Sequence, residues 1–206
     1  RISEIWFYPV KSLAGIRVKS ARVMAKGLAY DRRWMLVDEE GRFFTQREHP
    51  HMGLFQLDVE GAQLNITHPK NQEAIRLELT GAPTGPLSRV QIWDDEVDAV
   101  EVNPEFSHWF SERLKITCRL VFFPEMNRRD IDPDYAKHHE QVSLADGYPF
   151  LVIGQASLDL LNSKLAVPLP IRRFRPNFVV IGSTPHEENN WRNIKIGEIA
   201  FEGMKS

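Results

Sequence analysis

The chain has 206 residues, of which 42% are hydrophobic and 26% charged, the balance of a globular protein with one large domain or two small ones. Its formal net charge of −2 argues against a nucleic-acid binder, and no apolar run approaches the ~20 residues of a membrane span. A single cysteine, Cys118, excludes an internal disulfide scaffold and a Cys-rich zinc module.

Short β-prone segments dominate the first 120 residues. Gly, Pro and Asn separate them about every 8–12 residues, a spacing that predicts a closed or partly closed antiparallel sheet. One helix is expected after Asn103, which can cap it, with Pro104 at its first position and an apolar face through Phe106 and Phe110. The predicted strands are 5–8, 17–23, 34–37, 42–45, 54–59, 64–67, 74–79, 89–93, 97–102 and 116–123.

The pattern changes after a charged segment at 124–141, which we interpret as a long loop and as the place of a domain boundary. Continuous apolar runs at 149–154 and 178–182 predict strands buried on both faces, and 156–165 predicts a helix. We therefore expect an α+β protein, mainly β, with domains at 1–121 and 122–206.

Histidine and cysteine offer weak candidates for chemistry. His49 and His51 would face one side of a strand and could share a metal, but the sequence names no third ligand. Cys118 falls inside the apolar run 116–123, which predicts a buried structural thiol.

Three cationic segments are better candidates. Lys11 and Ser12 follow a strand broken by Pro9, where a cation, a hydroxyl and a free N–H form a small anion cradle. Two arginines, at 32 and 33, open a strand and would point to opposite faces, so that one of them can reach a ligand. Three more, at 172, 173 and 175, precede a buried strand near a sheet end, where ligands gather. Together these segments predict a site for a phosphorylated or other anionic ligand.

Several motifs also resemble a known family, in the order in which that family carries them. YPVKS at 8–12, GLAYDRRW at 27–34 and TQR at 45–47 resemble the N-terminal β-barrel domain of MOSC proteins. ADGYP at 145–149, ASLDLLN at 156–162, FRPN at 174–177, ENNW at 188–191 and IG at 196–197 resemble the MOSC domain itself. The resemblance covers almost the whole chain and is strongest to bacterial relatives of the mitochondrial amidoxime-reducing component.

The resemblance implies an N-terminal β-barrel packed on an incomplete MOSC β-barrel with one or two helices. It also implies a molybdenum cofactor (molybdopterin), a pterin dithiolene with a terminal phosphate, held between the two domains. By resemblance, Lys11, Ser12 and Arg32 would hold the phosphate. The residues that would line the pterin side are Asp146, Gly147, Tyr148, Arg175 and Asn177.

The implied function is reduction of N-hydroxylated small molecules by a cytoplasmic oxidoreductase. Its electrons would come from a separate reductase or a fused ferredoxin-like domain. In the family, a Cys-x-x-Cys-type segment soon after the strand matching 194–201 supplies the metal-ligating cysteine. We expect that cysteine to lie beyond the 206 residues, which alone would then be inactive. The rival reading is a non-catalytic module that carries the cofactor or sulfur, with a link to pyridoxal phosphate.

Overall fold

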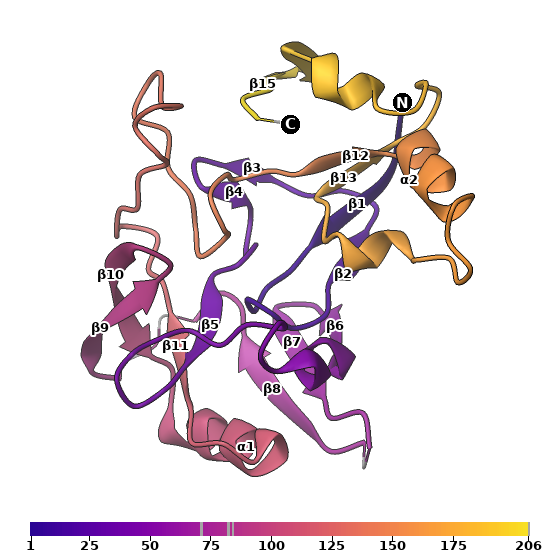
Figure 1. Cartoon of the computed structure of the whole chain (residues 1–206). Helices are drawn as coiled ribbons and strands as arrows, with labels where there is room; N and C mark the ends of the chain where they lie inside the picture. The colour runs from indigo at the N-terminus through magenta and orange to yellow at the C-terminus, as the bar shows by residue number, and fades with distance from the viewer. Residues whose placement is uncertain (71, 82, 84, 206) are drawn as a thin grey trace.

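The computed structural model describes residues 1–70, 72–81, 83 and 85–205; Ser206, the last residue of the second predicted domain, lies outside them. The described residues form fifteen strands, two α-helices and three short 3-10 helices (Figure 1). The predicted fold class, α+β and mainly β, is confirmed. The domain boundary near 121 stays a prediction.

The N-terminal part of the chain builds two antiparallel sheets that face a common core with helix α1 (Figure 1). One sheet has the order β5 (Trp34–Val37), β11 (Arg119–Phe122), β10 (Asp95–Glu101) and β9 (Leu87–Ile92). The other is a meander of β6 (Gln56–Glu60), β7 (Gln63–Thr67) and β8 (Ala74–Glu78). Leu64, Ile66 and Leu77 show the period-two burial of strands with one face on a core.

Helix α1 (Pro104–Leu114) forms where the sequence predicts it. The Asn103 side chain accepts a hydrogen bond from the backbone N–H of Glu105, and Lys115 ends the helix in the left-handed conformation. Phe106 and Phe110 are buried in the core that the helix shares with both sheets.

The predicted strand 42–45 is wrong. Residues 42 and 43 form only isolated bridges, to Gln91 and Val37, before the chain turns at Thr45, whose carbonyl accepts from His49. Residues Pro50–Leu54 then form the 3-10 helix η1. The strand expected at 17–23 is divided into β2 (Ile16–Val18) and β3 (Val23–Met24), and β3 pairs with β4 (Gly27–Leu28).

A third sheet joins the two ends of the chain, in the order β12 (Val152–Gly154), β13 (Phe178–Val180), β1 (Ile2–Phe7) and β2. β1 runs antiparallel to β13, with Ile5 opposite Phe178, and β12 runs parallel to β13. Because β1 and β13 are antiparallel, the residues that follow β1 lie beside those that precede β13. This pairing positions the candidate site.

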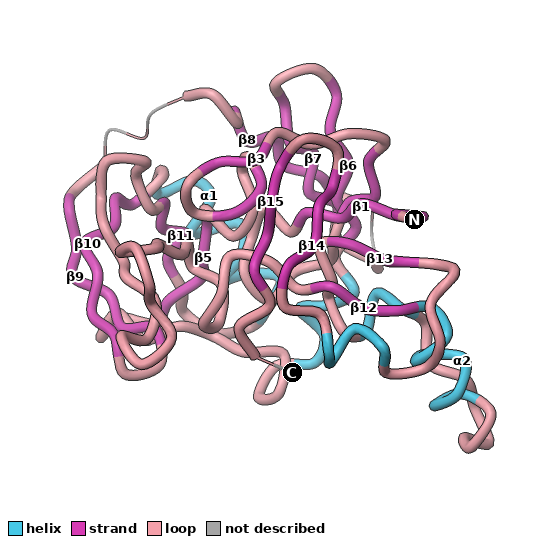
Figure 2. The backbone as a smooth tube through the Cα atoms, turned by 90° about the horizontal axis from the view of Figure 1, so that it is seen from above, coloured by secondary structure: helices cyan, strands magenta, loops and turns pink. Residues whose placement is uncertain are grey.

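The remaining elements lie around this sheet. Helix α2 (Gln155–Asn162) follows β12, η2 (Ile171–Arg173) precedes β13, and η3 (Glu187–Asn190) leads to the hairpin of β14 (Asn193–Ile196) and β15 (Ile199–Glu202). Figure 2 shows this hairpin in front of β12 and β13, and the ring of Phe201 contacts those of Phe150 and Phe178. β12 is only half-buried, contrary to the expectation from its apolar run, because it is the edge strand of its sheet.

Candidate functional site

A cavity of about 430 Å³ lies where the residues that follow β1 meet those that precede β13. All eight residues predicted for the site line it, although they come from four separate parts of the chain. Those parts are the bend after β1, the residue two before β5, the loop that precedes β12, and the segment that precedes β13. The eight lining residues are Lys11, Ser12, Arg32, Asp146, Gly147, Tyr148, Arg175 and Asn177.

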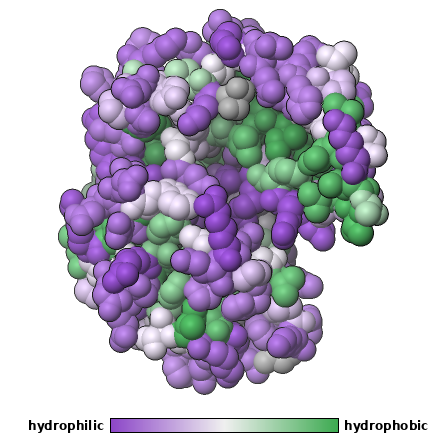
Figure 3. Space-filling model, viewed as in Figure 1, coloured by the Kyte–Doolittle hydropathy of each residue, from purple (hydrophilic) through white to green (hydrophobic). Residues whose placement is uncertain are grey.

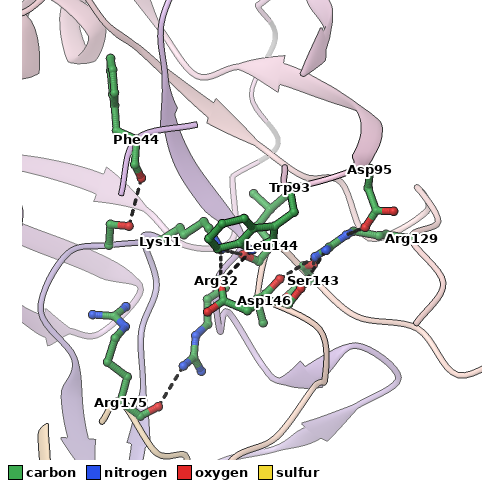
Figure 4. A network of polar contacts seen from close by, with 12 residues as sticks. Lys11, Arg32, Phe44, Trp93, Asp95, Arg129, Ser143, Leu144, Asp146 and Arg175 are labelled. Carbon is green, nitrogen blue, oxygen red and sulfur yellow. Dashed lines mark hydrogen bonds and ion pairs between the residues drawn. The ribbon is translucent and has the colours of Figure 1, made fainter. Parts of the chain in front are cut away.

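Lys11 is the cation that the bend after β1 supplies, and it is buried, with 6% of the residue exposed (Figure 4). Its Nζ donates to the Leu144 carbonyl at 3.0 Å and to Asp146 Oδ1 at 2.7 Å. Burial lowers the pKa of Lys11 to about 8, even though Asp146 favours the charged amine. Desolvation acts to raise the pKa of Asp146, but the charge of Lys11 and hydrogen bonds from Lys11 and Trp93 outweigh it and lower that pKa.

Arg32 joins the bend to the segment before β13. Its guanidinium donates to Asp31 Oδ2 at 2.5 Å, to Asn177 Oδ1 at 3.2 Å and to the Arg175 carbonyl at 3.0 Å. The guanidinium carbons of Arg32 and Arg175 lie 4.4 and 4.3 Å from the ring centre of Tyr8. Two cations against one aromatic ring concentrate positive charge at this wall of the cavity.

Arg175 carries the least compensated of these charges. Its Nη1 donates to the Leu13 carbonyl at 2.5 Å, and among the described residues it forms no salt bridge. Burial, with the nearby charge of Arg32, lowers the pKa of Arg175 to about 10, so the guanidinium remains charged at neutral pH. It can therefore attract an anion into the cavity.

Two predicted residues use their polar groups within the protein. The Ser12 hydroxyl donates to the Phe44 carbonyl at 3.0 Å. The Asn177 side chain accepts from the Leu151 N–H at 3.1 Å and from Arg32, and it donates to the Trp6 carbonyl at 3.3 Å. Both residues hold segments of the wall together, so their side chains are positioning groups.

Four residues of the cavity wall have left-handed backbone conformations, which cost an L-residue about 1–2 kcal/mol each. Such strain persists where the surrounding structure fixes it, and it is common at binding sites. The four are Ser12 (φ 67°), Arg32 (φ 49°), Trp93 (φ 55°) and Arg175 (φ 58°).

Apart from Tyr148, the sequence did not single out the aromatic residues that line the cavity. Trp93 lies in the tight turn between β9 and β10; its Nε1 donates to Asp146 at 3.1 Å and its ring meets that of Phe43 edge-on at 4.9 Å. The Arg47 guanidinium lies 5.5 Å from the Trp93 ring centre. Arg47 belongs to a motif noted above, whereas nothing local distinguishes Trp93 from a tryptophan in an ordinary hairpin turn. Further aromatic lining comes from Tyr148, Phe150 and Phe174.

Arg129 connects the loop that carries Asp146 to Asp95 at the start of β10 (Figure 4). Its Nε donates to Asp95 at 2.7 Å, and its two Nη atoms donate to the carbonyls of Ser143, Ala145 and Asp146 at 2.8, 2.6 and 3.0 Å. The sequence placed Arg129 in a charged loop, and the 124–141 segment indeed contains no helix or strand. Nothing in the charged composition of this segment distinguishes the buried Arg129 from its exposed neighbours.

Other candidates lie away from the cavity. Arg33 pairs with Glu125 at 2.6 Å and does not line the cavity, in accord with the opposite facing expected of Arg32 and Arg33. Cys118 is 2% exposed in the core around α1, as predicted, and burial raises its pKa. His49 and His51 stack edge-on at 6.0 Å, but the described residues contain no group of three His, Cys, Asp or Glu able to hold a metal.

The cavity has the donors and surfaces to hold a phosphorylated heterocycle. Lys11, Arg32 and Arg175 supply positive charge, and aromatic side chains line the same cavity, with Lys11 Nζ 5.1 Å from the ring centre of Phe43 and 5.9 Å from that of Trp93. The fold and the site together define a class of mainly β proteins in which a cationic, aromatic-lined cavity lies between the N-terminal sheets and the sheet of β12, β13, β1 and β2.

Comparison with known proteins identifies the family within that class. Residues 1–117 match the MOSC N-terminal beta barrel domain and residues 139–206 match the MOSC domain. The chain belongs to the family of proteins that combine these two domains.

Curated relatives align with nearly all of the chain. It is 33% identical to mitochondrial amidoxime-reducing component 1 of Mus musculus and 32% identical to mitochondrial amidoxime reducing component 2 of Bos taurus, with 98% of the chain covered in each case. It is 29% identical to molybdenum cofactor sulfurase of Oryza sativa subsp. japonica, again over 98% of the chain. The chain spans 61% and 62% of the two amidoxime-reducing components and 27% of the sulfurase.

No helix in the described part of the chain is both long enough and apolar enough to cross a membrane.

Proposed function

We propose that the chain binds the molybdenum cofactor in this cavity and serves an oxidoreductase that reduces N-hydroxylated small molecules. The observation that carries the proposal is the convergence of Lys11, Arg32 and Arg175 on one cavity with an aromatic wall. The relatives named for amidoxime reduction and for the molybdenum cofactor support it.

In this proposal the phosphate of the cofactor binds near Lys11 and Arg32, at the bend after β1. Arg–phosphate pairing is bidentate and strong, and Arg175 has N–H groups left for a polar heterocycle. Ser12 and Asn177 fix the wall, while the loop at 145–148 and the rings of Tyr148 and Trp93 bound the pterin side. When bound, the cofactor supplies the metal at which electrons reach the substrate.

Reduction of an N-hydroxylated group takes two electrons and two protons, cleaves the N–O bond and releases water. The proposal therefore requires an electron donor, either a separate reductase or a fused ferredoxin-like domain. The only thiol of the chain, Cys118, lies in the core and does not line the cavity, so the proposal assigns it no role toward the metal. A cytoplasmic location belongs to the same proposal.

The similarity to molybdenum cofactor sulfurase keeps a second function in view, a module that carries the cofactor or sulfur without reducing a substrate. Both functions predict a bound cofactor. An amidoxime distinguishes them: the metal-loaded protein, supplied with its electron donor, should reduce it only if the chain serves an oxidoreductase. If the chain instead binds pyridoxal phosphate, the purified protein should show the absorbance band of that bound aldehyde.

Two adjacent arginines give a matched test of the site. Arg32 and Arg33 have side chains that are 11% and 7% exposed, and each pairs with a carboxylate, so either change to alanine removes a buried guanidinium and its ion pair; the partner is buried for Arg32 (Asp31, 1% exposed) and exposed for Arg33 (Glu125, 58%). Only Arg32 lines the cavity. Arg32→Ala should lower cofactor content roughly 10–100-fold, since a charge-assisted hydrogen bond contributes ~1.5–3 kcal/mol, and Arg33→Ala should not.

The measurement is pterin and molybdenum content of the purified variants, with circular dichroism to show that each is folded. Equal cofactor content in both folded variants would contradict the proposed site. A selective loss in Arg33→Ala would reverse the assignment of the two side chains.

A further inference from the structure

A second cavity, of about 640 Å³, adjoins the first. It lies between η1 and β6 on one side and residues 169–173 on the other. Figure 3 shows an indentation of the surface in this region, between the part that contains α2 and the part that contains β6. Its volume is within the ~300–1,000 Å³ typical of sites for small organic ligands.

A thin wall separates the two cavities. Gln46, Arg173 and Arg175 line both. Gln46 Nε2 donates to the Ser12 carbonyl at 2.6 Å, and Arg175 donates to the neighbouring Leu13 carbonyl. The wall is thus fixed to the same bend that carries Lys11, and a ligand in either cavity touches it.

The charged side chains that line the second cavity are all positive. Arg172, Arg173 and Arg175 line it, and no acidic side chain is among the lining residues that the structure describes. Arg172 and Arg173 are exposed and make no salt bridge among the described residues, so their guanidinium groups are available to a ligand. Planar guanidinium groups pair best with a carboxylate or a similar oxyanion.

The rest of the lining is largely apolar. Trp6, Phe55 and Leu57 lie along the cavity, and Leu54 is 60% exposed at the end of η1. Leu169 and Pro170 face them from the segment that leads into η2. A large exposed leucine beside unpaired arginines favours a ligand that has both an apolar body and a charged end.

We propose that this second cavity is a binding site for amphiphilic organic anions, with the carboxylate on Arg172 and Arg173 and the hydrocarbon body along Trp6 and Leu54. The proposal does not depend on the function assigned to the first cavity. Occupancy places the ligand against Gln46 and Arg175, next to the proposed cofactor site.

Calorimetric titration with phenylbutyrate and with its neutral amide tests the proposal on the whole chain. Phenylbutyrate should bind, and the amide should bind at least roughly 10-fold more weakly, because it loses the charge-assisted hydrogen bonds. In a series of fatty acids from butyrate to octanoate, affinity should rise about three- to fourfold per methylene, the increment expected for burial of a CH₂ group.

Matched variants locate the site. Arg172→Gln, which alters only the second cavity, should weaken phenylbutyrate binding roughly 10-fold. Arg22→Gln removes the same charge from an exposed position outside both cavities and should leave the affinity unchanged. Lys11→Gln, in the first cavity alone, should also leave it unchanged.

Three results would overturn the proposal. The first is equal affinity for acid and amide. The second is an affinity that does not depend on chain length, which would indicate simple surface ion pairing. The third is a loss of binding in Lys11→Gln but not in Arg172→Gln, which would place the anion in the first cavity.

Discussion

Replacing Arg129 should destabilise the protein far more than replacing its neighbour Arg128. The Arg129 guanidinium is 4% exposed and makes four hydrogen bonds, three of them to carbonyls of the loop at 143–146. Arg129→Met keeps much of the side-chain volume but removes every one of these donors. The carbonyls of Ser143 and Ala145 then lose their partner in a buried setting.

The magnitude follows from those contacts. Net loss of a hydrogen bond costs about 1 kcal/mol, so the four bonds of Arg129 together contribute about 4 kcal/mol, whereas Asp95, which is 49% exposed, can exchange its partner for water. We expect the free energy of unfolding to fall by about 3–5 kcal/mol. Arg129→Lys keeps the charge but not the forked set of donors, so its free energy of unfolding should lie between those of Arg129→Met and the unchanged protein.

Arg128 supplies the control. It pairs with Asp130 at 2.6 Å, but both side chains are more than half exposed, at 53% and 52%. Arg128→Met should therefore change the free energy of unfolding by no more than about 1 kcal/mol. Urea denaturation measures both variants, and amide hydrogen exchange at 143–146 reports the loop itself. If the two methionine variants unfold at the same urea concentration, Arg129 does not hold this loop.

Three further predictions concern the cavity and the core. Sulfate, whose charge is constant in this pH range, should bind in the first cavity with full affinity below about pH 8, where Lys11 is charged. As the pH rises through the pKa of Lys11, the affinity for sulfate should fall by up to roughly 10-fold. Titration calorimetry measures this affinity and should show no such fall in Lys11→Arg. Cys118→Ser should lower the free energy of unfolding by ~1–3 kcal/mol by placing a hydroxyl in the core, without changing the cofactor content; a folded variant that loses the cofactor would contradict a structural role. The 206-residue chain supplied with cofactor and a chemical reductant should not reduce a model amidoxime, because its only thiol is buried away from the cavity; product in a chromatographic assay would show otherwise.

Local patterns predicted much of the fold and the cationic residues of the cavity, whereas the family resemblance alone supplied Asp146, Gly147, Tyr148 and Asn177. α1 could be predicted because Asn103, Pro104 and the apolar spacing lie within a few residues of one another. The cationic segments could be found because Lys11, Arg32 and Arg175 each stand in a recognisable motif. Their convergence could be expected only from the family resemblance, since no local pattern encodes contacts between distant segments.

The parts that were missed depend on such distant contacts. Trp93 belongs to the cavity because the turn of one hairpin reaches Asp146, 53 residues away. Arg129 is buried because the loop at 143–146 folds over it. The strand expected at 42–45 forms only bridges because the chain leaves the sheet at Thr45, a turn that the β-prone residues do not reveal.

The pairing of β1 with β13 has a consequence for how the chain acquires its structure. β1 can pair with β2 as soon as residues 16–18 are made, but its other edge pairs with β13, with Ile2 opposite Val180, so that edge has no partner until residue 180 has left the ribosome. At about 5–20 residues per second this takes roughly 10–35 s, during which one edge of β1 stays unpaired. Contacts of such long sequence separation also slow folding. The wall that contains Arg32 and Arg175 closes only when this pairing forms, so a ligand of the first cavity can enter its finished site only after the segment that contains β13 has been synthesised.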